Sequence, residues 1–199
     1  MTNAPDAEGS TDNFDSLPSP VHHPDARLSD YARATISDLN LAPHPEGGWF
    51  RRDWQSPHTT AHAAQDAALG DQGSATGARP FASLIYFLLP AGDYSEWHKV
   101  DADEVWLWHG PGTVKLGFGG TGSAPHLERV VELGVQAGRD SEDARKATTQ
   151  VTEGVSYLTA AGHAIVPAGV WQRTIPSQTD ALVSCMVSPG FVFDGFSLE

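Results

Sequence analysis

The chain has 199 residues, which is enough for one domain with a substantial core and too few for two comfortable ones. With 12 Lys and Arg against 25 Asp and Glu, its formal net charge is −13, and such a surface repels phosphate backbones and anionic lipids, which argues against nucleic acid or a membrane as partner. One cysteine excludes an intrachain disulfide, and the acidic N-terminus lacks the pattern of a signal peptide, so we expect a cytoplasmic protein.

The first part of the chain combines a polar tail with one helix. Residues 1–26 are rich in Asp, Ser and Pro and show no hydrophobic period, which predicts a disordered acidic tail before a single domain at 27–199. Apolar residues then follow helical spacing over 29–39, with Ser29 or Asp30 as the N-cap. We therefore expect one short helix, which the prolines that follow would stop.

A strand and a long loop are predicted next. Residues 49–54 follow two glycines and carry the aromatic residues of a strand. Residues 56–79 are rich in Ala, His, Gly, Gln and Asp in no periodic order, which predicts a long loop. His44 precedes this strand between two prolines, and we interpret it as structural.

From residue 80 onward, short apolar runs alternate with turns that contain glycine or proline. The run 81–89 is apolar almost throughout, as is typical of a strand buried on both faces. Further strands are predicted at 94–100, 104–109, 113–118, 127–133, 156–158, 164–166, 170–175 and 182–187, with a second long loop at about 138–155. One helix followed by many short strands predicts an all-β sandwich or barrel.

Two segments carry the residues that suggest chemistry. In the first, a tight turn joins the strands that hold His98 and Glu104, so the two side chains are predicted to face each other across a hairpin. Because side chains alternate along a strand, Glu104, Trp106 and Trp108 should share one face and form a pocket wall. In the second segment, a Pro-Ala-Gly turn is expected to direct Gln172 toward the same end of the barrel.

These segments resemble the paired motifs of the cupin superfamily. Gly92, His98, Glu104 and Gly110 match the first motif, although Val100 stands where its second histidine belongs. Gly162, Pro167 and Gly169 match the second motif, in which Gln172 replaces a histidine. Segments 41–50, 83–89, 166–172 and 183–191 narrow the resemblance to a single-domain cupin family often labelled "predicted sugar epimerase", over about residues 38–199.

The resemblance implies a fold and an assembly. The expected fold is a cupin-type double-stranded β-helix, which is an antiparallel jelly-roll barrel, with a short N-terminal helix. Cupins of this kind usually pair, so we expect a homodimer. In metal cupins, three histidines and a glutamate bind a divalent ion; here His98, Glu104 and Gln172 would be the ligands, and the amide of Gln172 is a poor one.

Three functions stay open at this point. The first is an isomerase or epimerase acting on a sugar-like molecule, with His98 as base, Glu104 orienting it, and Tyr86 as acid if its strand turns it inward. Trp106, Trp108, Gln172 and Arg51 would bind the substrate. The second is a metal-dependent oxygenase or isomerase with a reduced ligand set, and the third is a ligand-binding protein without chemistry. A further alternative is that His98 and Glu104 only form hydrogen bonds with each other inside the barrel and have no catalytic task.

Overall fold

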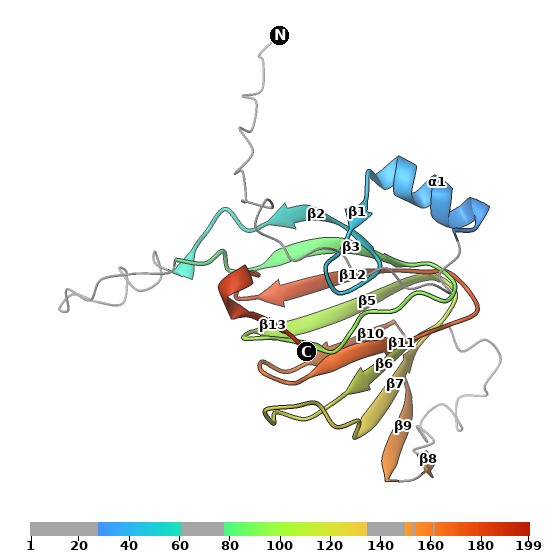
Figure 1. Cartoon of the computed structure of the whole chain (residues 1–199). Helices are drawn as coiled ribbons and strands as arrows, with labels where there is room; N and C mark the ends of the chain where they lie inside the picture. Colours follow the sequence, from blue (N-terminus) through green and yellow to red (C-terminus); the bar gives the residue numbers. More distant parts are fainter. Residues whose placement is uncertain (1–27, 61–77, 135–149, 153, 161) are drawn as a thin grey trace.

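Two β-sheets and one helix make up the part of the chain that the computed structural model describes, residues 28–60, 78–134, 150–152, 154–160 and 162–199 (Figure 1). The elements are α1 (Asp30–Leu39), β1 (Ala42–Pro43), β2 (Trp49–Gln55), β3 (Ser83–Leu89), β4 (His98–Val100), β5 (Asp103–Pro111), β6 (Val114–Phe118), β7 (Arg129–Leu133), β8 (Gln150–Thr152), β9 (Val155–Ala160), β10 (His163–Val166), β11 (Gln172–Ile175), β12 (Ala181–Ser188), the 3-10 turn η2 (Phe193–Gly195) and β13 (Phe196–Leu198).

The two sheets enclose one hydrophobic core. The first sheet has the order β1-β2-β3-β12-β5-β10 and the second β13-β4-β11-β6-β7-β9-β8. Among the described strands, β7 and β9 pair in parallel and the other pairs are antiparallel. Inward side chains of both sheets, such as Phe87 and Trp106 from the first and Leu116 and Leu133 from the second, form the core. The predicted all-β barrel with a short N-terminal helix is confirmed, with one parallel pair added.

The helix α1 covers the outer face of the first sheet. Ser29 caps it, with its hydroxyl accepting from the Ala32 N–H at 3.0 Å, and Asn40 ends it in the left-handed conformation at φ 51°. A small apolar cluster around Ala32, Leu41 and Leu88 joins the helix to the sheet. The helix therefore lies on the side of the sheet that faces away from the barrel interior.

Strands β4 and β5 lie in different sheets, so the predicted hairpin is wrong. β4 pairs with β11 and β13, whereas β5 pairs with β12 and β10. Asp101 and Ala102 carry the chain across from one sheet to the other. The consequence for function is that His98 and Glu104 enter the barrel from opposing sheets rather than from neighbouring strands.

Several predictions fall wholly or mostly outside the described residues. These are the acidic tail at 1–26, most of the loop at 56–79 and most of the loop at 138–155. At the ends of the first loop, Thr59 and Pro80 form an isolated bridge, and the end of the second includes the short strand β8. Within the described chain, no helix has both the length and the apolar character that crossing a membrane requires.

Candidate functional site

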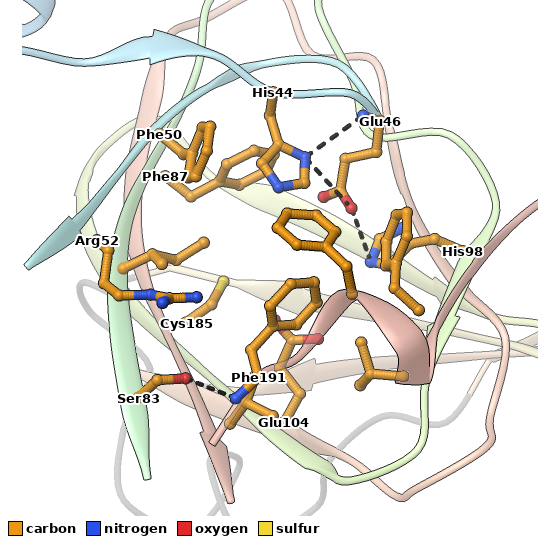
Figure 2. Close-up of a pocket in the computed structure, with 15 residues that line it drawn as sticks. His44, Glu46, Phe50, Arg52, Ser83, Phe87, His98, Glu104, Cys185 and Phe191 are labelled. Carbon is orange, nitrogen blue, oxygen red and sulfur yellow. Dashed lines mark hydrogen bonds and ion pairs between the residues drawn. The ribbon is translucent and has the colours of Figure 1, made fainter. Parts of the chain in front are cut away.

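A cavity lies between the sheets and encloses about 560 Å³ of empty space, counting the part that opens to solvent (Figure 2). Polar groups and aromatic rings share its lining. The residues that line it are His44, Glu46, Phe50, Arg52, Ser83, Ile85, Phe87, His98, Val100, Glu104, Cys185, Val187, Phe191, Phe193 and Phe196. A concave, largely apolar site with a few convergent polar groups is the usual form of a small-molecule pocket.

His98 is held as a neutral base. Its Nδ1 lies 2.8 Å from the backbone carbonyl oxygen of Glu96. Because a carbonyl can only accept, Nδ1 carries the hydrogen and Nε2 presents a lone pair. Burial lowers the pKa of His98 to about 4, against a smaller opposing effect of the Glu96 bond, so the ring is uncharged at neutral pH.

Glu46 is the partner of that lone pair. Its Oε2 lies 3.4 Å from His98 Nε2 and 3.6 Å from His44 Nδ1 (Figure 2). Burial, together with repulsion from Glu104, raises the pKa of Glu46 well above its ordinary range. Burial therefore favours the protonated form of the carboxyl group, and in that form its O–H can donate to His98.

His44 presents the opposite polarity to His98. Its Nδ1 accepts from the backbone N–H of Glu46 at 3.3 Å, so its hydrogen is on Nε2, the ring nitrogen that points into the cavity in Figure 2. Burial, and then repulsion from His98, lower the pKa of His44 to about 3. The cavity thus offers one imidazole as acceptor and another as donor, both uncharged.

A tight glycine turn places His44 and Glu46 over the sheet. Gly48 has φ 70°, and a Cβ there would lie 2.9 Å from the Leu88 carbonyl oxygen and 2.9 Å from the Phe87 ring. Only glycine allows the backbone to approach β3 this closely. The turn brings the segment before β2 close to His98.

Glu104 is held from behind by Gln172. The Gln172 Nε2 donates to Glu104 Oε2 at 2.5 Å, while its Oε1 accepts from Trp106 Nε1 at 2.9 Å. Gln172 is 0% exposed, so it supports the cavity wall without lining it. Burial raises the pKa of Glu104 to about 7, against smaller effects of hydrogen bonds with Gln172 and Cys185.

The C-terminal segment supplies three aromatic rings to the cavity, from Phe191, Phe193 and Phe196. Arg79 fixes the start of this segment. Its guanidinium group donates to the carbonyl oxygens of Gly190 at 2.8 Å and Pro189 at 3.1 Å, and to the Asp101 carboxylate at 2.8 Å. Arg79 therefore ties this C-terminal segment, whose three phenylalanine rings we call the aromatic cover, to the turn between β4 and β5.

Comparisons with known proteins agree with this architecture. The family model described as Cupin superfamily (DUF985) matches residues 33–199. The chain belongs to this cupin family. Its structure is similar to a Shewanella oneidensis protein with 28% identity and a TM-score of 0.58, covering 84% of this chain and 84% of that one. A hypothetical protein from Leishmania major gives 22% identity and a TM-score of 0.58, over 84% of this chain and 86% of that one. No curated protein matches the chain.

The cupin barrel brings some of the expected site residues together. His98 and Glu104 both line the cavity, from opposing sheets. Trp106 is buried in the core and bonds to Gln172, so it stands in the second layer of the wall. Trp108 is half-buried and packs against the core, with its Nε1 donating to the Gly112 carbonyl oxygen at 2.7 Å.

Two expected residues lie on the other face of the first sheet. Ser83, Ile85 and Phe87 of β3 point inward, so Tyr86 points outward and packs beneath α1. Arg51 lies opposite Tyr86 on β2, with its guanidinium carbon 5.7 Å from the ring centroid. Neither side chain reaches the cavity, and the guanidinium group there belongs to Arg52.

His44, Glu46 and Arg52 are the polar residues that sequence reasoning missed. A signal was present for the first two, because the segment 41–50 helped to carry the family resemblance although no role was assigned to it. Arg52 could have been chosen over Arg51 by alternation from the apolar Phe50. Cys185 is buried beside Glu104 at the cavity wall, and burial raises the pKa of its thiol.

The residues present do not fit the metal centre of metal-binding cupins. In the described chain, no group of three or more His, Cys, Asp and Glu is placed to hold a metal ion. Val100 contributes an apolar side chain where the motif has its second histidine, and Gln172 lies behind Glu104 with both ends of its amide engaged. Membership of the cupin superfamily supports small-molecule binding, and we derive no step through a metal.

Proposed function

We propose that this cupin binds a small polar molecule in the cavity and moves a proton on it, as an isomerase or epimerase with His98 as base. One observation carries the proposal. The Glu96 carbonyl fixes the tautomer of His98, so that the neutral Nε2 lone pair lies on the cavity side of the ring, the side on which Glu46 also lies. A base of this kind can remove a proton from carbon beside a carbonyl group.

The neighbouring groups support the remaining steps. When the C–H proton moves to His98 Nε2, the electron pair passes into the substrate carbonyl, whose oxygen then needs a hydrogen-bond donor. The neutral N–H of His44 is a donor of this kind, and so is the protonated form of Glu46, which burial favours. Since Tyr86 lies on the outer face, we assign the returning acid to Glu104, whose pKa near 7 suits either direction of transfer.

Sugar-like molecules are the first substrates to test, because the family resemblance is to proteins labelled sugar epimerases. We expect the wild-type protein in D₂O to incorporate deuterium at the carbon beside the carbonyl group of its substrate, as followed by NMR. His98→Asn should slow this exchange by about a hundredfold or more, since positioned bases contribute about 10²–10⁴-fold. Asn can still donate to the Glu96 carbonyl, so the fold should persist.

His126→Asn is the matched control, because His126 is exposed on the loop before β7 and does not line the cavity. Exchange that survives in His98→Asn at the wild-type rate would contradict the assignment of the base. A ligand that binds without exchange in the wild-type protein would instead make this a binding protein. Metal analysis of protein purified without chelators tests the metal-dependent alternative.

The oligomeric state of the protein and its location in the cell are also proposals. From the family resemblance we propose that the 21.2 kDa chain forms a homodimer, and from its single cysteine that it is located in the cytoplasm. Light scattering on the full chain measures the mass directly. A mass equal to one chain at micromolar concentration would contradict the dimer.

A further inference from the structure

Arg52 is the cation of the cavity. It occupies β2 two residues after Phe50, and strand alternation gives both side chains the same inward face, opposite Ile85 of β3. Figure 2 shows its guanidinium group extending into the cavity near Cys185, on the side away from His98. Among the lining residues that the structure describes, no other arginine or lysine occurs.

The surroundings of Arg52 favour an anionic ligand. Five phenylalanine rings and three aliphatic side chains contribute most of the lining, so the charge on Arg52 acts in a medium that screens it weakly. Both histidines of the cavity are uncharged at neutral pH, because burial lowers their pKa values, and burial raises the pKa of Glu46, which favours its neutral form. A planar guanidinium group can donate two parallel hydrogen bonds to a carboxylate.

We propose that the ligand of this cavity is a small monocarboxylic acid, whose carboxylate binds Arg52 while its reacting carbon faces His98. This rests on the proposed function for the role of His98, whereas the carboxylate site stands on the position of Arg52 alone. One guanidinium group presents one planar pair of parallel donors, which a single carboxylate fills. A phosphate dianion would bring a second charge beside Glu104, in a protein whose net charge is already −13.

The test uses pairs of ligands that differ in the carboxylate. Glucuronate against glucose and mandelate against mandelamide are titrated into the full chain by calorimetry and thermal shift, with inorganic phosphate as a further probe. We expect at least one acid to bind about tenfold or more tightly than its neutral partner, because a hydrogen bond to a charged group contributes about 1.5–3 kcal/mol and 1.4 kcal/mol is tenfold. Phosphate should bind more weakly than that acid.

Adjacent arginines provide the variants. Arg52→Gln should remove the preference for the acid, and Arg52→Lys should retain part of it, because lysine keeps the charge without the planar pair of donors. Arg51→Gln makes the same change in charge on the outer face, where Arg51 pairs with Asp53 at 2.8 Å, and should bind the acid like the wild-type protein. If Arg52→Gln fails to fold, the comparison between Arg52→Lys and Arg51→Gln decides.

Three results would overturn the proposal. The first is that every acid binds no more tightly than its neutral partner, and the second is that phosphate binds more tightly than any acid. The third is that Arg52→Gln keeps the full preference for the acid, or that Arg52→Lys keeps it in full where Arg52→Gln fails to fold. These outcomes are separate from the failure of the proposed chemistry, which deuterium exchange measures. His98→Asn should still prefer the acid, so a carboxylate site without proton transfer would be recognised as such.

Discussion

At the scale of single residues, Gln172 shows how a polar group can take over a position that the cupin motif gives to histidine. Its amide donates to Glu104 and accepts from Trp106, so one side chain satisfies two buried partners at once. A histidine could also bond to two neighbours, but it would bring a titratable ring into a wall that already contains a carboxyl group of raised pKa. The amide keeps its donor and acceptor at every pH.

Replacing Gln172 by Leu should lower the free energy of unfolding by about 2–6 kcal/mol, because the Glu104 oxygen and the Trp106 N–H would both stay buried without this partner, at about 1–3 kcal/mol each. Urea denaturation followed by tryptophan fluorescence measures the change. Gln178→Leu serves as the control, since Gln178 is exposed on the turn before β12. Equal stability of the two variants would show that the Gln172 bonds contribute nothing net.

The residues of the site could be predicted only in part. His98 and Glu104 were found because a motif of fixed spacing contains them. Glu46 could not be linked to His98, since the two meet through a turn that depends on the absence of a side chain at Gly48. Strand alternation decides which of the two adjacent arginines points inward, but only once it is known which face of the strand lies toward the barrel interior.

At the scale of elements, runs of apolar residues bounded by glycine and proline located the strands well. The helix, β2, β3, β5 to β7, and β9 to β12 lie where the pattern places them, within a few residues at each end. The short strands β1, β8 and β13 were not predicted, because two or three residues carry no periodic signal. The hairpin failed for a different reason: the turn length is compatible with a hairpin, and pairing of both strands with distant partners decides against it.

The C-terminal segment depends on Arg79 for its position. Arg79→Gln should weaken binding of the cavity ligand about three- to tenfold, because the segment that contains Phe191, Phe193 and Phe196 loses bonds to its backbone and becomes less well ordered. Calorimetry measures the affinity. Arg33→Gln removes an exposed arginine from α1, paired with Asp30 at 3.0 Å, and should leave the affinity unchanged. Unchanged affinity in Arg79→Gln would show that the aromatic cover needs no anchor.

At the scale of the whole molecule, the buried titratable groups oppose one another in their effect on stability. The pKa of Glu104 rises from 4.5 to about 7 on folding, so its contribution is fully present below pH 4.5 and is lost as the pH rises to about 7. The pKa of His98 falls from 6.5 to about 4, so its contribution is present above pH 6.5 and is lost as the pH falls to about 4. Between these limits the two trends offset each other.

Glu104→Gln should remove one side of this balance. The difference in free energy of unfolding between the variant and the wild-type protein should shift in favour of the variant by on the order of 3 kcal/mol as the pH rises from about 4.5 to about 7.5. The reason is that each pKa unit corresponds to about 1.4 kcal/mol. Urea denaturation of both proteins at the two pH values gives the difference. A gap between variant and wild type that is the same at both pH values would contradict the raised pKa of Glu104.

The crossing between β4 and β5 has a mechanical consequence. His98 projects from one sheet, and Arg52 and Glu104 from the other, so a ligand bound at both ends would link the two sheets through the middle of the barrel. The motion of each sheet relative to the other would then be restricted. Amide hydrogen exchange should slow on ligand binding even in β6 and β7, which contribute no residue to the cavity lining, and the reach of that protection would report how rigidly the layers are coupled.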